Sequence, residues 1–395
     1  MPSLFSRLLG GGRDIARSVE PPQTKASRAL PLIAISNTGR PVWTPREGQA
    51  LAREGYRKNA IVYRCVRLIA EAAASVELTT FVGDQEITNH PAKHLLDRPN
   101  PREAGRQFME SLYGHLLISG NAYIEAAMLD AAIHELYVLR PDRMRIIQGA
   151  SGWPEAYEYT VGGRSIRFAV DEADQCGILH LSLFDPVDDH YGMPPLAAAQ
   201  MALDTHNAAS AWNKALLDNA ARPSGALVYT ADGGNLTDEQ FERLKAELES
   251  NFQGAMNAGR PILLEGGLDW KPLSMSPKEM DFLEAKAGAA REIALAFGVP
   301  PLLLGLPGDN TYSNYAEANR AFWRQTIIPM VKRTFDSFAH WLEPSFPNLR
   351  FEIDLDRIDA LAEHREALWR SVTSADFLDE QEKRAALGYG PRSCS

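Results

Sequence analysis

The alternation of hydrophobic and polar positions divides the chain into helical and extended stretches. Apolar residues recur at helical spacing over residues 59–74, and a second helical pattern covers residues 107–118. A strand–turn–strand pattern over residues 76–88 lies between them. Six short β-rich runs follow, at residues 122–129, 133–139, 144–148, 157–161, 165–170 and 178–183. Residues 29–190 are therefore predicted to form a mixed α+β domain.

Two long helices and a small module are predicted after this domain. Residues 196–221 contain ten alanines and no Gly or Pro, which favours one helix of about 26 residues, or about 39 Å. Residues 278–297 show a second helical pattern, which Gly298 ends. Between them, residues 222–272 combine three strand patterns with an amphipathic helix. The economical arrangement is a helical stalk with the module at its tip.

The C-terminal part is predicted to contain a kinked helix, a strand and two short helices. Residues 316–342 are apolar on nearly every side, and Pro329 must kink this helix because it removes a backbone donor. A strand pattern at residues 349–355 precedes helical patterns at residues 356–372 and 379–387. A helix that is hydrophobic all round needs burial, either within this chain or against copies of it.

Charge and composition exclude several classes of protein. The 395 residues carry 41 Lys and Arg against 51 Asp and Glu, a net charge of −10, which argues against a large basic surface that coats nucleic acid. Residues 351–382 contribute −7 of this charge, whereas residues 1–28 carry +3 and are expected to form a flexible arm. Three widely spaced cysteines exclude a disulfide framework or a zinc knuckle, and no apolar run is long enough to span a membrane.

One cluster of side chains is similar to an enzyme site. Asp185, Asp188, Asp189 and His190 could hold a divalent metal for hydrolysis. Their spacing matches no specific ligand pattern, so a polar loop that closes a strand is the favoured interpretation. The sequence contains no Walker-type loop and no GxGxxG, HExxH or GxSxG motif. The residues alone therefore predict no catalytic site, no cofactor and no metal.

Two pairs of residues on predicted helices are candidates for contacts. Arg320 and Arg324 lie one turn apart, and either ion pairing with Glu317 or a contact to DNA phosphate or a neighbouring subunit would explain them. Ala208 and Ala211 belong to the alanine-rich stretch, where small side chains permit close packing of helices. Helix propensity alone is the alternative explanation for these alanines.

Short motifs spread over residues 56–345 occur in a fixed order. Each is weak alone, but the ordered series is specific. The motifs occupy residues 56–59, 62–66, 69–70, 95–101, 120–123, 180–188, 192–196, 257–260, 264–267, 282–284, 291–294, 297–301, 304–305, 311–314 and 326–329. On these residues the chain resembles the portal proteins of tailed double-stranded DNA phages, in the siphovirus-type branch. Its compactness resembles the portals of gene transfer agents, and a prophage origin fits equally well.

The resemblance implies an α+β portal fold that assembles into rings, typically of twelve subunits. The implied parts are a flexible N-terminal arm at residues 1–28, a wing at 29–195, a first stem helix at 196–221, a clip at 222–272, a second stem helix at 273–299, a tunnel loop and tunnel helix at 300–342, and a wing return strand with a short helical crown at 343–395. Ala208 and Ala211 then become candidates for packing between stems.

The resemblance also implies the role of a head–tail connector, a structural protein of the virion and not an enzyme. Double-stranded DNA would be packaged and later ejected through the ring at one capsid vertex, without sequence specificity. The implied partners are the terminase large subunit, which hydrolyses ATP, the major capsid protein and a head–tail adaptor. The implied locations are the virion or phage-like particle and, during assembly, the bacterial cytoplasm, with no membrane partner.

The tunnel loop is expected to project into the channel of such a ring. Its side chains offer soft polar contacts instead of cations that would hold phosphates, and they are Asp309, Asn310, Thr311, Tyr312, Ser313 and Asn314. An ordinary exterior loop is the alternative interpretation. Two other functions stay open, which are a metal-dependent hydrolase using the aspartate cluster and a helical scaffold or adaptor without a channel.

Overall fold

The computed structural model describes most of the chain from residue 43 onward. The described residues are 43–45, 48–129, 132–171, 176–218, 225–229, 237, 239, 242–243, 268–272, 282–306 and 312–389. The chain divides into two compact units, Met1–Val42 and Trp43–Ser395, and every described residue belongs to the second unit. Among the described residues, no helix combines the length and the apolar character needed to cross a bilayer.

Helices α2 (Ala60–Ala74) and α4 (Gly105–Ser119) form the centre of the hydrophobic core. Helix α2 begins where predicted because the Asn59 side chain accepts hydrogen bonds from the amides of Ile61 and Val62. Its buried face packs against α4, which Gly120 ends in the left-handed conformation. Two short elements were not predicted. One is a helical stretch at residues 48–56, in which a π-helical turn follows α1 (Gly48–Leu51). The other is α3 (Pro91–Asp97).

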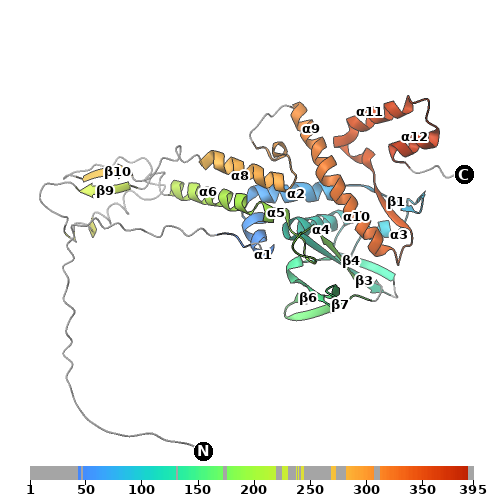
Figure 1. The fold of residues 1–395 in the computed structure, drawn as a ribbon, viewed down its shortest axis with the longest axis horizontal. Coiled ribbons are helices and arrows are strands. Elements are labelled where there is room, and N and C mark those ends of the chain that lie inside the picture. Colours follow the sequence, from blue (N-terminus) through green and yellow to red (C-terminus); the bar gives the residue numbers. More distant parts are fainter. Residues whose placement is uncertain are drawn as a thin grey trace, which may run out of the picture. The chain divides into compact units, whose positions relative to one another are not determined.

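A three-stranded antiparallel sheet joins distant parts of the chain. The predicted hairpin is confirmed as β1 (Leu78–Val82) and β2 (Gln85–Glu86). Strand β11 (Leu349–Ile353) pairs with β1 in the order β11-β1-β2, with Thr80 opposite Phe351. The C-terminal part of the chain therefore returns to the first strand of the domain, as Figure 1 shows.

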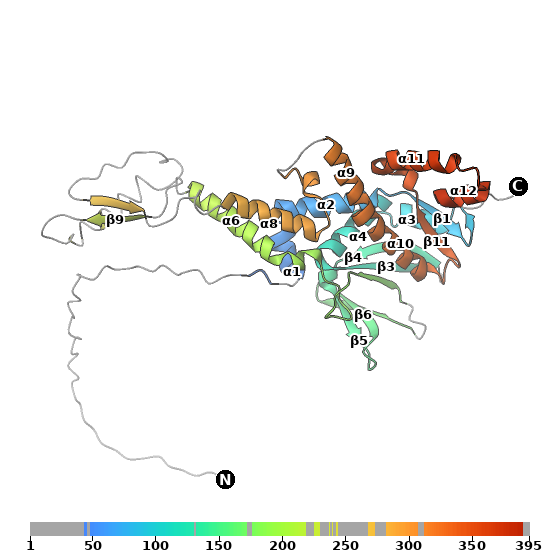
Figure 2. The ribbon, with the colours of Figure 1, turned by 45° about the horizontal axis from the view of Figure 1, so that its top comes forward.

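The six predicted strands are confirmed and form two further antiparallel sheets. Strands β3 (Asn121–Leu129), β4 (Ala132–Leu139) and β8 (Ile178–Ser182) have the order β4-β3-β8. Strands β5 (Met144–Gln148), β6 (Pro154–Val161) and β7 (Arg164–Ala169) have the order β5-β6-β7. A second small core, which includes Tyr123, Met144 and Ile178, lies between these sheets, and Figure 2 shows β5 and β6 beside β3.

Two helices that are distant in sequence pack side by side after this α+β part. The prediction of one helix over residues 196–221 is wrong, because α5 (Pro195–Ala198) and α6 (Gln200–Asp218) are separated at Ala199, whose ψ of 18° lies outside the helical range. Helix α8 (Phe282–Ala296) packs along α6 (Figures 1 and 2).

Strands β9 (Gly225–Tyr229) and β10 (Leu268–Pro272) are an antiparallel pair between these helices in sequence. They confirm two of the three strands expected in residues 222–272. The third expected strand, at residues 261–265, and most of the expected helix at residues 236–252 lie outside the described residues.

The helix predicted over residues 316–342 consists of three segments. Helix α9 (Tyr312–Phe322) begins four residues earlier than expected, a π-helical turn covers Trp323–Ile327, and α10 (Ile328–Leu342) follows. Pro329 lies at the start of α10, where its missing amide interrupts the helical hydrogen-bond ladder and the wider turn takes up the irregularity. The kink predicted at Pro329 is therefore confirmed as an irregular turn directly before it.

The C-terminal residues form two short helices that pack against each other. The helix predicted over residues 356–372 is only partly present, because two 3₁₀ turns, Leu355–Arg357 and Asp359–Leu361, come before α11 (Ala362–Thr373). Helix α12 (Glu380–Leu387) begins with a capping box between Asp379 and Glu382.

Candidate channel segment and subunit-contact surfaces

Three of the six residues predicted for a tunnel loop belong to the part of the chain that the structure describes. Asp309, Asn310 and Thr311 lie outside the described residues. Tyr312, Ser313 and Asn314 instead form the first turn of α9, where Ser313 and Asn314 are exposed. Helix α9 therefore begins within the predicted tunnel loop, and the loop ends four residues earlier than the sequence indicated.

The chain is firmly anchored before this segment. After α8, a 3₁₀ turn at Pro301–Leu304 packs Leu303 and Leu304 against the main core. The hydroxyl of Thr326, in the π-helical turn, donates a hydrogen bond to the carbonyl of Gly298 at 2.7 Å. These contacts fix where the chain leaves the core before the candidate channel segment.

The two candidate arginines have different surroundings. Arg320 lies 3.4 Å from Glu317, one turn earlier, and 3.9 Å from Glu363 in α11. Ion pairing therefore accounts for Arg320, which is half-buried. Arg324 is exposed, and no ion pair joins it to another residue in the described part of the chain. Arg324 is consequently the cation of this pair that is available for an external phosphate or a neighbouring subunit.

The outward face of α6 carries small and apolar side chains. The inward face, which includes Ala202, Leu203 and Ala209, is buried against α8. Ala208 and Ala211 lie on the opposite, exposed face, with Met201 67% exposed on the same side. An apolar helix face of this kind has nothing to pack against within the described chain.

A buried polar cluster joins the α+β part to α6. The Asn59 side chain, which caps α2, also donates to the Nδ1 atom of His206 at 3.0 Å and to the Oδ1 atom of Asn207 at 2.9 Å. Asn207 in turn donates to the carbonyl of Glu54. Burial, and then the charge of Lys286, lowers the pKa of His206, so the ring is held neutral and accepts from Asn59. This cluster fixes the direction in which α6 leaves the core.

The aspartate cluster forms a structured loop. The Asp185 carboxylate accepts a hydrogen bond from the Val187 amide, and the Asp188 carboxylate accepts from the amides of His190 and Tyr191. The two backbone bonds to Asp188, first that from Tyr191, lower its pKa. Within the described residues, no group of three or more His, Cys, Asp or Glu side chains could hold a metal ion. The hydrogen bonds at Asp185 and Asp188 are those of the polar loop that the sequence favoured.

A neighbouring histidine is half-buried and structural. The ring of His180 stacks on Tyr123, with 4.3 Å between the ring centroids, and its Nε2 atom lies 3.0 Å from Oδ1 of Asn121. Burial lowers the pKa of His180 to about 4. Asn121 also joins the backbone of Gly192 through both side-chain atoms. Sequence reasoning missed this Asn121–Gly192 contact, although both residues belong to the motifs at residues 120–123 and 192–196.

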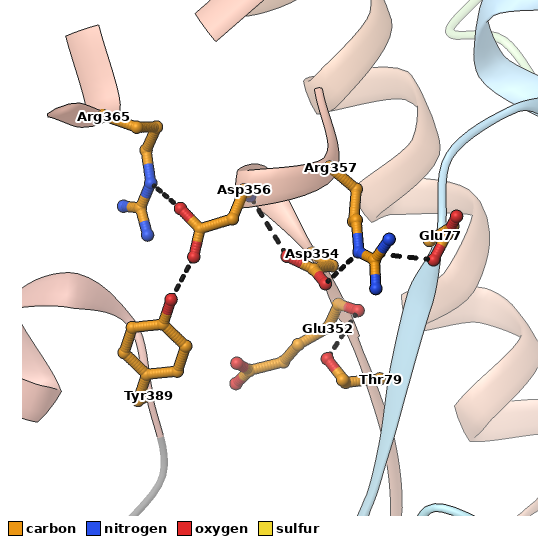
Figure 3. Close-up of polar contacts among 8 residues, drawn as sticks. All are labelled: Glu77, Thr79, Glu352, Asp354, Asp356, Arg357, Arg365 and Tyr389. Atoms are coloured by element: carbon orange, nitrogen blue, oxygen red, sulfur yellow. Dashed lines mark hydrogen bonds and ion pairs between the residues drawn. The ribbon is translucent and has the colours of Figure 1, made fainter. Parts of the chain in front are cut away.

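The C-terminal helices are held by a second polar network, which Figure 3 shows. Arg365 is buried and donates to Oδ1 of Asp356 at 2.6 Å and to the carbonyl of Leu387 at 2.9 Å. The Tyr389 hydroxyl donates to the other oxygen of Asp356. The hydrogen bond from Arg365 is the largest cause of the lowered pKa of Asp356. Arg357 lies 3.9 Å from Glu77 and so links this network to the residue before β1.

The family model described as phage portal protein matches residues 60–388, which is most of the chain. This chain belongs to the phage portal protein family. The match covers both the α+β part and the segments after α8, so the portal resemblance and the portal fold expected from the motifs are confirmed.

Relatives and solved structures agree with this assignment. An uncharacterized protein of Rickettsia bellii is 43% identical over 85% of this chain and 88% of its own length. The probable portal protein of Streptomyces phage phiC31 is 27% identical over 84% of this chain and 74% of its own length. A chain in the neck of an empty gene transfer agent particle, solved with sixfold symmetry, is 51% identical with a TM-score of 0.70, over 91% of this chain and 98% of that one.

A chain in the neck of the native gene transfer agent particle, solved with twelvefold symmetry, is also 51% identical, with a TM-score of 0.68 over 90% of this chain and 97% of that chain. The expected location in a virion or phage-like particle and the expected homo-oligomer are supported by these two necks. Helices α6 and α8 lie within the ranges of the two stem helices that the resemblance implied.

Proposed function

We propose that this chain is the portal subunit of a phage-like particle and that twelve copies form a ring through which double-stranded DNA is packaged and ejected. The observation that carries the proposal is the 51% identity, over nearly the full length, with a chain in a neck of twelvefold symmetry. The ring is a structural conduit, and ATP hydrolysis is assigned to a separate terminase large subunit. The major capsid protein and a head–tail adaptor are its other proposed partners.

The charge of the chain suits a channel that DNA must leave again. Each subunit carries a formal net charge of −10, so a ring would repel DNA except at specific contacts. Residues 305–315 are proposed to reach the channel, with Asp309, Asn310, Thr311, Tyr312, Ser313 and Asn314 giving polar, weakly held contacts. Exposed Arg324 is proposed as a phosphate contact or a contact to the next subunit.

Residues 222–272 are proposed as the clip that docks the terminase. They form an excursion between α6 and α8 and contribute the β9–β10 pair, so their replacement leaves the packed α6–α8 pair in place. Replacing residues 230–267 by a short Gly-Ser linker retains both strands and should abolish terminase capture in a pull-down while ring formation persists. Capture that survives in intact rings would move the docking site elsewhere.

The proposed ring has a direct test. The purified full-length chain, examined by negative-stain electron microscopy and native mass spectrometry, should give rings with a central hole and a mass of twelve 43.6-kDa subunits. Closed assemblies without a hole would instead favour a scaffold or adaptor. A chain that stays monomeric at every concentration and salt condition would contradict the proposal.

A further inference from the structure

A pocket of about 400 Å³ opens at the N-terminal end of α4. Its walls come from the end of α2, from β1, from α3 and from the start of α4, with Phe335 and Phe351 contributing aromatic surface. The pocket is open on one side, and its volume suits one aromatic and one aliphatic side chain. It is distinct from the α6 and α8 surfaces described above.

The pocket contains a hydroxyl without a hydrogen-bond partner, and two cations lie among its charged side chains. Thr80 lines it and is only 2% exposed, yet no hydrogen-bond partner reaches its hydroxyl. Such a buried orphan hydroxyl is unfavourable until something bonds to it. Lys93 and Arg106 also line the pocket, and neither has an ion pair among the residues that the structure describes. Two acidic residues share this lining, Asp97 and Glu77, and Glu77 lies 3.9 Å from Arg357.

The loop at residues 183–190, called here the acidic finger, has the complementary chemistry. Phe184 and Val187 are 82% and 90% exposed, and among the large apolar side chains of the described residues only Phe377, at 85%, is exposed to the same degree. Asp188 and Asp189 are exposed beside them. Large apolar groups displayed this openly on a soluble face usually mark a contact.

The acidic finger is also rigid. Asp185 and Asp188 bond to backbone amides within the loop, and its base is held by Arg333, which donates to the Ser182 carbonyl, and by the Leu183 amide, which donates to the Gly120 carbonyl at 2.8 Å. A loop already fixed in one conformation loses little entropy when it binds.

The finger and the pocket lie at opposite ends of α4. The pocket includes Gly105 and Met109 at the first turns, whereas the finger is held at Gly120, directly after the last turn. Fifteen residues of helix separate them by about 22 Å. The finger therefore cannot fill the pocket of its own chain, but a neighbouring copy can supply one.

We propose that the acidic finger of each subunit inserts Phe184 and Val187 into the α2–β1–α4 pocket of the next subunit, with Asp189 against the rim cations Lys93 and Arg106. The contact is head-to-tail, which is the kind that closes a ring. It rests on the proposed ring, and it assigns to the α+β part a subunit contact separate from the stems. The bound finger also offers Thr80 its missing acceptor.

Site-directed cross-linking tests the pairing directly. Val187→Cys and Ala74→Cys are combined in one chain that also carries Cys176→Ser and Cys394→Ser, and assembled rings are treated with a short bismaleimide. The expected result is a ladder of covalent oligomers on denaturing gels, absent from either single cysteine variant. Intact rings that give no ladder would overturn the finger–pocket contact and leave the portal assignment untouched. Absence of rings from the wild-type chain would instead contradict the proposed function.

Two substitutions give independent readouts of the same contact. Phe184→Ala should raise the concentration for half-maximal ring formation by about tenfold or more, whereas the equally exposed Phe377→Ala should leave it unchanged. Thr80→Val should raise the melting temperature of the isolated subunit, because the orphan hydroxyl is removed, and yet weaken ring formation. Equal ring formation by wild type and both variants would overturn the proposal. The Ala74→Cys variant also reports on the pocket through the rate at which a maleimide labels its cysteine. If inorganic phosphate slows this labelling in the isolated subunit and ring formation does not, the pocket binds a small anion and the finger–pocket contact is overturned.

Discussion

The backbones of Gly120 and Gly192 are in close contact, although the two residues are 72 positions apart in the sequence. A Cβ atom on Gly120 would lie 2.2 Å from the Gly192 carbonyl oxygen, and a Cβ on Gly192 would lie 2.3 Å from that of Gly120. Asn121 seals this contact, since its side chain donates to the Gly192 carbonyl and accepts from the Gly192 amide. The contact fixes the exit of α4 and the end of the acidic finger in one place.

Gly120→Ala should therefore be strongly destabilising. Gly120 has a φ of +75° and no room for a methyl group, so we expect a loss of about 3 kcal/mol or more in the free energy of unfolding, measured by urea denaturation. Gly114→Ala is the matched control on the same helix. Nothing lies within 4 Å of a Cβ at Gly114, so this change should stabilise the protein by about 0.5–1 kcal/mol. Similar effects of both changes would contradict the close contact.

Stability should also fall in mild acid because of buried histidines. The pKa of His180 is lowered to about 4, so the folded state binds its proton less readily than the unfolded state, whose value is about 6.5. The contribution of His180 to the free energy of unfolding is fully present above pH 6.5 and is lost progressively as the pH falls toward 4. At pH 5 about 2 kcal/mol of it is lost. The lowered pKa of His206 acts in the same direction.

Unfolding midpoints at pH 7.5 and pH 5 check this expectation. His180→Gln should reduce the difference between the two midpoints, whereas the exposed His340→Gln should leave the difference unchanged. An equally large acid effect in the His180 variant would show that another group controls it.

Local signals predicted much of the secondary structure, while contacts over long sequence distances were not visible to them. Asn59 caps α2 where its pattern begins, and the irregular turn before Pro329 follows from the missing amide. The break at Ala199 was missed because alanine favours helix on both sides, and the geometry there depends on how α5 packs. Thr80 pairs with Phe351, which lies 271 positions later in the sequence, and the spacing of apolar residues carries no information about a pairing over that distance.

The candidate site was predictable to a similar degree. Exposed Ala208 and Ala211 on α6 agree with a packing face, because their spacing places them opposite the buried positions. The sequence offered the same alternatives for Arg320 and Arg324, whereas the structure pairs Arg320 with Glu317 and with Glu363 of α11. The Asn121–Gly192 contact needed three-dimensional information, although the motif residues marked both of its ends.

Replacing Ala208 or Ala211 by Trp should disrupt the proposed ring. Both side chains are exposed in the single chain, so the subunit should fold normally, with its unfolding midpoint unchanged. Overpacking between stems should then shift the protein from rings to smaller species in analytical ultracentrifugation. Ala386→Trp, on the exposed side of α12, is the control and should leave rings intact. Intact rings in both stem variants would show that this face of α6 does not meet a neighbour.

The final prediction concerns the proposed channel segment at residues 305–315. Replacing Asn310, Thr311 and Ser313 together by Ala removes three polar side chains without adding charge or bulk. If these residues contact DNA in the lumen, rings should assemble normally, because the core anchors at Leu303, Leu304 and Thr326 are untouched. Particles should nevertheless retain less DNA, since weak phosphate contacts that slow its escape are lost.

The measurement is the DNA content of nuclease-treated particles after a period of storage, compared with wild type. Glu317→Ala with Arg320→Ala, which removes the neighbouring ion pair on α9 but leaves the segment unchanged, serves as the control. A triple variant with normal rings and normal DNA retention would place this segment outside the channel, whereas a loss confined to the triple variant supports contact with the packaged DNA.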